Sequence, residues 1–181
     1  MRQLTYHCTV FRIFIFLNLF LLFTGFQQPG GLVKGSQAPD FSVVTMNGDS
    51  IRLSALKGSI VFVDFWASWC LPCRSQNSTL TKIHDKYRLT VRRTGVPLVF
   101  ISISLDTNKD FWRVAVRKDN LNPRRQVCDS TGWESAIVKE YQIKKIPSSF
   151  LIDADGKIIE KDLWDGALSD AIERQFNRLS N

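Results

Sequence analysis

Ile60–Trp66, an almost unbroken apolar run, leads directly to two cysteines, Cys70 and Cys73. The length of this run and its β-branched and aromatic residues are typical of a strand that is buried on both faces of a sheet. Asp64 interrupts the run, and an acid at such a position needs a physical reason. The residues after Cys73 follow a helical pattern as far as about Arg88. The cysteines are therefore predicted to lie where a buried strand gives way to a helix.

This position gives the two cysteines different chemistry. Residues three apart on a helical turn share one face and lie within reach of a disulfide. A helix N-terminus presents unpaired N–H groups and partial positive charge, which stabilise a thiolate. Cys70 is expected there with a lowered pKa, and Cys73 one turn inside and more buried. Pro72 fits the first turn, where its missing N–H costs nothing.

Two other interpretations of the cysteine pair stay open. The pair could be half of a zinc site, but a structural zinc needs four ligands, and the chain has no second CxxC. The pair could also be an inert structural disulfide, although so small a loop gains little chain entropy from closure. We expect no bound metal.

The rest of the chain predicts an α/β fold with a mixed central sheet and helices on both faces. Asn47-Gly48 predicts a tight hairpin turn near the N-terminus. One predicted helix has Phe111, Val114 and Ala115 on its inner side. The other elements come from short apolar runs and helical spacing. The predictions are strands at 38–44, 50–52, 98–105, 148–152 and 157–163, a helical turn at 53–56, and helices at 109–118, 133–141 and 168–179.

The N-terminus differs from the rest of the chain. Arg2 and Arg12 are the only charged residues in 1–26, and residues 13–23 are apolar except for one Asn. This pattern predicts a signal peptide or an uncleaved N-terminal membrane anchor at 1–26, with residues 10–26 as the possible tether. A linker at 27–36 and one domain at 37–181 follow. Export places the domain in the periplasm or at the outer face of the cytoplasmic membrane, where disulfides persist.

Composition excludes several classes of protein. The chain has 181 residues, of which 44% are apolar and 23% charged, which argues against disordered, collagen-like and coiled-coil proteins. The formal charge of +7 comes from scattered basic residues without zinc-finger spacing or an RNA-binding pattern. We therefore expect no nucleic-acid partner. No motif for a small-molecule cofactor is present, so we expect none.

The segment VDFWASWCLPCR, residues 63–74, resembles the active-site segment of thioredoxins. With APDF near the N-terminus, IPSSFLIDADGKII at 146–159 and the extra helical stretch between them, residues 36–179 resemble the exported TlpA/ResA-like branch. This resemblance implies a thioredoxin-like fold with an N-terminal β-hairpin extension and a central helical insertion. It also implies thiol–disulfide oxidoreductase activity and a role in cell redox homeostasis.

The resemblance also implies a role for each matching residue. Cys70 matches the nucleophile, and Cys73 the residue that resolves the mixed disulfide and leaves a redox-active Cys70–Cys73 disulfide. Pro147 matches the cis-proline that faces the cysteines, and the backbone of Ile146 would pair with an extended substrate segment.

Further residues are expected around the cysteines. Asp64 matches a buried acid that exchanges a proton with Cys73, and its alternative is an acid held by backbone hydrogen bonds. Ser102 stands where thioredoxins commonly have a lysine near that acid. Trp69, Leu71 and Pro72 are predicted to contact substrate. Of the others, Trp66 is expected in the core, Cys128 as a buried inert thiol and His84 at the surface.

The predicted function is that of an exported oxidoreductase that exchanges disulfides with protein partners, as a reductant, and is regenerated by an unidentified redox partner. One alternative is a peroxiredoxin-like peroxidase, but Val63 and Ala67 stand where that family needs Pro and Thr. The other is a copper(I) carrier, although such proteins of this fold usually have a longer cysteine spacing and a later His, and none follows His84.

Overall fold

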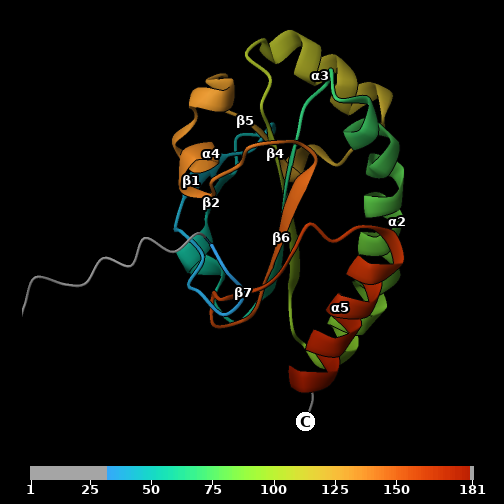
Figure 1. The fold of residues 1–181 in the computed structure, drawn as a ribbon. Coiled ribbons are helices and arrows are strands. Elements are labelled where there is room, and N and C mark those ends of the chain that lie inside the picture. The colour runs from blue at the N-terminus through green and yellow to red at the C-terminus, as the bar shows by residue number, and fades with distance from the viewer. Residues whose placement is uncertain (1–31, 180–181) are drawn as a thin grey trace, which may run out of the picture. The chain divides into compact units, whose positions relative to one another are not determined.

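A computed structural model of the chain describes residues 32–179. The predicted signal or anchor at 1–26 and the first part of the linker lie outside these residues. The central sheet has five strands in the order β5-β4-β3-β6-β7 (Figure 1). Strands β3, β4 and β5 are parallel, while β6 and β7 are antiparallel to their neighbours, so the predicted mixed sheet is confirmed. The strands are β3 (Ile60–Trp66), β4 (Leu98–Ser104), β5 (Gln126–Cys128), β6 (Ser148–Ile152) and β7 (Ile158–Lys161).

The predicted central strand is β3, and all seven of its residues are buried. It pairs with β4 on one side and with β6 on the other. Within these ladders Asp64 lies opposite Ser102 of β4 and opposite Ser149 of β6. A strand enclosed on both edges and both faces has no contact with water, which explains the near-continuous apolar sequence.

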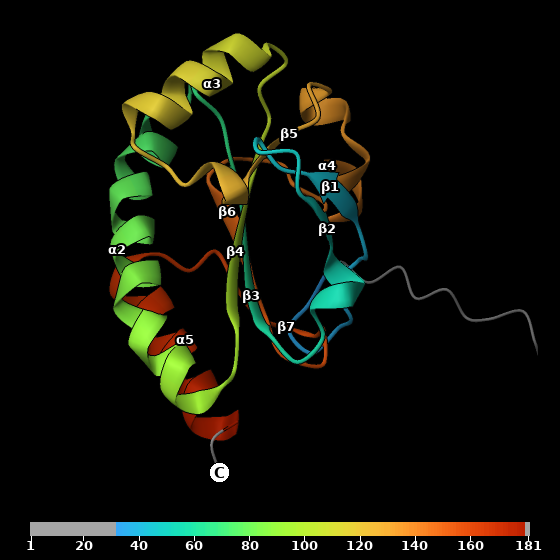
Figure 2. The ribbon, with the colours of Figure 1, turned by 180° about the vertical axis from the view of Figure 1, so that it is seen from behind.

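Helices cover both faces of the sheet, as predicted. Helices α2 (Leu71–Thr94) and α5 (Asp165–Leu179) lie together on one face (Figures 1 and 2). One hydrophobic cluster joins them to Phe62 of β3. A second cluster fills the other face beneath α3 (Lys109–Lys118) and α4 (Ala136–Glu140).

The N-terminal hairpin forms a separate two-stranded sheet of β1 (Ser42–Val44) and β2 (Ser50–Arg52). Its turn contains Gly48, whose φ of 88° favours glycine. The predicted helical turn at 53–56 is the 3₁₀ helix η1 (Leu53–Leu56). Within the predicted linker, the Gly35 N–H donates to the Ile158 carbonyl at the start of β7 over 2.7 Å.

The helix after the cysteines is six residues longer than we predicted. It ends at Thr94, where the N–H of left-handed Gly95 donates to the Val91 carbonyl over 2.9 Å. Val91 packs against the cluster between α2 and α5. Arg92 and Arg93 stand in the last turn, where positive charge is favourable. The packing of Val91 and the Gly95 cap therefore determine where α2 ends, rather than the local sequence pattern near residue 88.

The predicted inner side of α3 is wrong. Phe111 and Val114 are 67% and 53% exposed, whereas the buried residues are Trp112, Ala115 and Val116. Both sets share helical spacing, but burial of Trp112 removes more apolar area from water than burial of Phe111. Only Ala115 was assigned to the correct side.

Two further elements differ from the prediction. The predicted helix at 133–141 is divided into η3 (Gly132–Glu134) and α4, because Ser135 is extended, with φ −52° and ψ 133°, and donates its hydroxyl to Asp129. Strand β5 was not predicted, because three residues are too few to show alternation. The 3₁₀ helix η2 (Pro123–Arg125) precedes β5.

Within residues 32–179, no helix has the length and apolar character of a membrane span.

Candidate active site

The two cysteines lie at the junction of β3 and α2. Cys70 is the N-cap of α2, and its N–H donates to the Ala67 carbonyl over 3.1 Å. Cys70 and Cys73 are joined by a disulfide, with their Cα atoms 5.3 Å apart. Cys70 is 6% exposed and Cys73 is 2% exposed, so Cys70 is the more accessible of these two buried residues.

The surroundings of Cys70 favour negative charge on its sulfur. The Cys73 N–H donates to the Cys70 Sγ over 3.2 Å, which makes the sulfur a cap of the helix. Partial positive charge from the helix N-terminus adds to this hydrogen bond. The first turn of α2 contains no acidic residue that would oppose it. Pro72 stands in this turn, as expected from its missing N–H.

Exposed apolar side chains surround the disulfide. Trp69 is 57% exposed and Leu71 is 79% exposed, and Pro72 is exposed beside them. Large exposed apolar residues are typical of surfaces that contact a partner. Trp66, by contrast, is buried in the cluster under α3 and α4, as predicted.

The Ile146-Pro147 segment reaches the same end of the sheet. Its peptide bond is cis, as in the family pattern. Pairing of β3 with β6 ends at Phe65 and Ser148, so continuing the register would place Pro147 beside Trp66. The loop that carries the cysteines begins directly after Trp66. Ile146 and Pro147 are half-buried there.

Asp64 is 3% exposed and accepts a hydrogen bond of 2.7 Å from the Ser102 hydroxyl. Burial raises the pKa of Asp64 from 3.8 to about 7, against the opposing effects of Ser102 and the positive charge of Arg125. Ser102 thus occupies the position of the lysine as a hydrogen-bond donor, and Arg125 from η2 supplies the cation. No hydrogen bond between residues 32–179 joins Asp64 to either cysteine, so its proposed role remains a prediction.

A second buried acid, Asp106, anchors the loop before the cysteines, and sequence reasoning missed it. Its carboxylate accepts from the Ser68 N–H over 2.8 Å and from the Ser68 hydroxyl over 2.6 Å. The Ser104 hydroxyl donates to it over 2.6 Å. The available signal was an acid directly after the apolar run at 98–105, at the sheet end where parallel strands meet loops.

An ion pair fixes the first turns of α2 to the end of α3. The Arg74 guanidinium donates two hydrogen bonds to the carboxylate of Asp119, and the Asn77 amide donates a third over 2.9 Å. Although burial opposes it, these donors hold the pKa of Asp119 below its usual value. Arg74 also donates to the Ser68 carbonyl over 3.2 Å. The loop between β3 and α2, which leads to the cysteines, is therefore fixed by Asp106 at the end of β4 and, through Arg74, by Asp119 at the end of α3.

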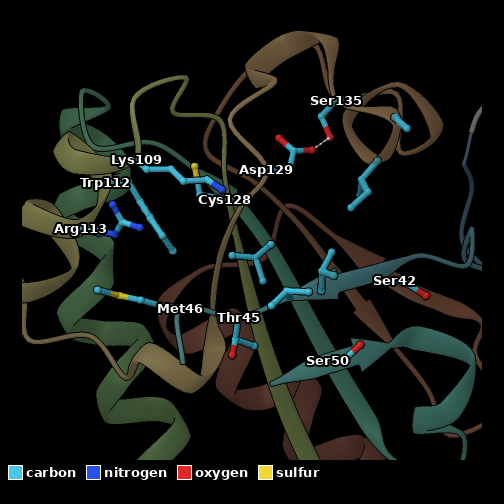
Figure 3. A pocket seen from close by; sticks show the side chains of 15 residues that line it. Ser42, Thr45, Met46, Ser50, Lys109, Trp112, Arg113, Cys128, Asp129 and Ser135 are labelled. Carbon is cyan, nitrogen blue, oxygen red and sulfur yellow. Dashed lines mark hydrogen bonds between the residues drawn. The ribbon is translucent and has the colours of Figure 1, made fainter. Parts of the chain in front are cut away.

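Cys128 lies apart from the disulfide and is the free cysteine of the described residues. It lines a cavity of about 540 Å³ between the hairpin, α3 and α4 (Figure 3). The Cys128 thiol donates to the Asp106 carbonyl over 3.2 Å, and burial raises its pKa above the usual value. These contacts fit the predicted buried thiol. His84 is half-buried on α2 and not at the surface as predicted, with its ring against that of Phe100.

Two observations bear on the alternative functions. Residues 32–179 contain no group of three or more His, Cys, Asp or Glu side chains that could hold a metal ion. Val63 and Ala67, at the two positions that a peroxiredoxin needs as Pro and Thr, are fully buried and apolar. A dithiol beside an apolar rim can exchange a disulfide with another protein.

Comparison with known proteins places this site in a family. The model of the AhpC/TSA family matches residues 34–161. The chain belongs to the AhpC/TSA family. The thiol-disulfide oxidoreductase ResA of Bacillus anthracis is 32% identical over 158 residues, which cover 84% of this chain and 86% of that protein. The thioredoxin-like protein YneN of Bacillus subtilis (strain 168) is 30% identical over 128 residues, covering 71% and 70%.

Solved structures of similar proteins have the same fold. A thiol-disulfide oxidoreductase from Bacteroides fragilis NCTC 9343 matches with a TM-score of 0.67 and 31% identity, over 77% of this chain and 98% of that one. The thioredoxin domain of a thiol-disulfide oxidoreductase from Bacteroides vulgatus matches with a TM-score of 0.69 and 28% identity, over 80% and 98%. These relatives confirm the thioredoxin-like fold and the enzyme class, thiol–disulfide oxidoreductase, that the sequence predicts.

Proposed function

We propose that this protein is an exported thiol–disulfide oxidoreductase that reduces disulfides in protein partners. The observation that carries the proposal is the Cys70 Sγ at the N-terminus of α2, where it accepts the Cys73 N–H. A sulfur in this position is stabilised as a thiolate, which is the attacking form of cysteine. The apolar rim of Trp69, Leu71 and Pro72 supports a protein substrate rather than a small polar one.

The reaction begins with the reduced Cys70–Cys73 pair. The Cys70 thiolate attacks one sulfur of the substrate disulfide, that bond breaks, and the other substrate sulfur leaves as a thiolate that takes up a proton. A mixed disulfide now joins Cys70 to the substrate. The Cys73 thiolate then attacks the Cys70 Sγ and releases the second substrate thiolate. Two electrons have passed to the substrate, and the enzyme keeps the Cys70–Cys73 disulfide until a redox partner reduces it.

Asp64 is proposed to take the proton of Cys73 before this second attack. Its pKa of about 7 lets it both accept and return a proton near neutral pH. We expect Asp64→Asn to slow the resolving step more than the first attack. Stopped-flow exchange with a fluorescent disulfide separates the two steps, and equal slowing of both, or slowing of neither, would contradict a proton-transfer role.

Ile146 and Pro147 are proposed to hold the substrate as an extended segment beside the cysteines. Residues 1–26 are proposed to direct the chain out of the cytoplasm, as a cleaved signal or as an anchor, to the periplasm or the outer membrane face. Fractionation of cells that express the full chain, followed by mass determination of its N-terminus, tests the export proposal and distinguishes the two forms.

Trapping of the mixed disulfide tests the function directly. The Cys73→Ser variant should accumulate a stable mixed disulfide with a protein substrate, and Cys70→Ser should form none, because only Cys70 attacks. Peroxide consumption and copper(I) retention by the same wild-type chain are the matched assays for the alternative functions. Rapid peroxide turnover without disulfide exchange, or tight copper binding without it, would overturn the proposal.

A further inference from the structure

Two lysines precede the proposed substrate-binding residues. Lys144 and Lys145 are both exposed and lie between Ile143, which is buried, and the Ile146-Pro147 segment. The Ile143 N–H donates to the Val138 carbonyl over 2.9 Å, which ties the start of this loop to α4. Strand β6 begins at Ser148, so the far end is tied to the central sheet. The lysines are therefore held in place by structure on both sides.

Neither lysine is engaged within the described part of the chain. The ion pairs among residues 32–179 do not include Lys144 or Lys145, although nearby Lys139 pairs with Glu134. The N–H and carbonyl of Ile146 likewise form no hydrogen bond to residues 32–179. Backbone polar groups at the surface without a protein partner are available for an added strand. This short segment thus offers an unpaired backbone together with two unpaired positive charges.

Two acids near the cysteine loop, Asp106 and Asp119, are engaged by groups other than these lysines. Asp106 is held by Ser68 and Ser104. Asp119 is neutralised by Arg74. The sequence has no acidic residue between Asp64 and Asp85, and therefore none in the first three turns of α2. The two charged residues between Ile143 and the Ile146-Pro147 segment are therefore both positive and exposed.

We propose that Lys144 and Lys145 select protein substrates that carry an Asp or Glu close to the reactive cysteine. The inference rests on the proposed function. A substrate strand paired with Ile146 places its neighbouring residues opposite the lysines, because cross-strand Cβ atoms lie about 4.5–5.5 Å apart. The substrate cysteine must reach the Cys70 Sγ, which lies at the same end of the sheet. The carboxylate is therefore within about three residues of that cysteine, counted by strand spacing.

Two matched peptides test this selectivity with the full chain. Both carry the same cysteine as a mixed disulfide with a neutral thiol, one with Glu at the two flanking positions and one with Gln. The variant is Lys144→Gln combined with Lys145→Gln. The control is Arg92→Gln combined with Arg93→Gln, which removes the same net charge in the last turn of α2. By helix rise, these residues lie about 32 Å from the start of α2, where the cysteines are.

We expect the wild-type chain to reduce the Glu peptide with a kcat/KM about fivefold above that of the Gln peptide at low salt. The preference should shrink as salt rises, because exposed charges are screened. It should disappear in the lysine variant and persist in the arginine control. The inference would be overturned by an equal kcat/KM for both peptides, or by a preference that survives in the lysine variant. In either case, reduction that depends on Cys70 would still support the proposed function. No reduction of either peptide would overturn both.

Discussion

Two buried acids lie near the cysteines, and their surroundings differ in the number of hydrogen-bond donors. Asp64 of β3 accepts from the single hydroxyl of Ser102, whereas Asp106 after β4 accepts from two groups of Ser68 and from Ser104. Burial is similar, at 3% and 2% exposure. The difference is therefore one of hydrogen bonding and not of contact with water.

The comparison shows that two buried carboxylates in one fold can have different functions, depending on how many hydrogen-bond donors surround each. A buried carboxylate with one donor is poorly stabilised as an anion, and the pKa of Asp64 rises to about 7. A carboxylate with several donors can instead hold two segments together. Asp106 connects Ser68, in the loop before the cysteines, to Ser104 at the end of β4. We therefore expect substitution of Asp64 to alter pH dependence and substitution of Asp106 to alter the stability of the loop.

The largest expected effect concerns Asp64 and pH. Its folded-state pKa of about 7 lies above its unfolded value of 3.8, so its contribution to stability is full below pH 4 and is lost as pH rises to about 7. This gap corresponds to about 4 kcal/mol. The oxidised Asp64→Asn variant should match the wild type at pH 4 and exceed its free energy of unfolding by about that amount at pH 8.

Urea unfolding at both pH values checks this expectation, with Asp110→Asn as a control at an exposed acid. A wild-type free energy of unfolding that differs from that of Asp64→Asn equally at pH 4 and pH 8 would show that Asp64 is not the source of the pH dependence.

A smaller effect is expected for Asp106→Asn. The amide would place an N–H₂ donor among the donors of Ser68 and Ser104, leaving at least one buried donor unpaired. Such a loss costs about 1–3 kcal/mol in unfolding free energy. Urea unfolding at fixed pH measures the cost, and hydrogen exchange at the Ser68 amide should quicken. An unchanged exchange rate at Ser68 would contradict the connector role.

The smallest effect is expected from Arg125→Gln. Arg125 lowers the pKa of Asp64 through its charge, less than Ser102 does through its hydrogen bond. Removing that charge should raise the pKa of Asp64 above about 7, as followed by carboxyl ¹³C shifts. Arg124→Gln is the matched control, since Arg124 is exposed and its charge has no resolved effect on Asp64. A fall in the pKa of Asp64 would contradict the assignment.

The same comparison explains how far the sequence predicts this molecule. Strand β3, the start of α2 and the hairpin turn were predictable, because each depends on residues close in the chain. Asp64 stood out since it interrupts an apolar run. The sequence did not predict the environment of Asp64, because the hydroxyl that donates to it belongs to Ser102, 38 residues further along the chain.

Features that depend on tertiary contacts escaped prediction. The inner side of α3 was wrong because local spacing fits two faces, and only the core selects Trp112. Strand β5 has three residues and takes its conformation from pairing with β4. The Ser68–Asp106 connection joins two loops, and neither loop has a pattern that points to the other.

The pKa of the Cys70 thiol tests the central claim most directly. In the reduced Cys73→Ser variant, thiolate absorbance at 240 nm can be followed against pH, with the double variant Cys70→Ser, Cys73→Ser as the blank for Cys128. The position of Cys70 at the N-terminus of α2 predicts a pKa well below the value of about 8.5 for a free cysteine. A value at or above about 8.5 would contradict the claim that this helix end activates Cys70.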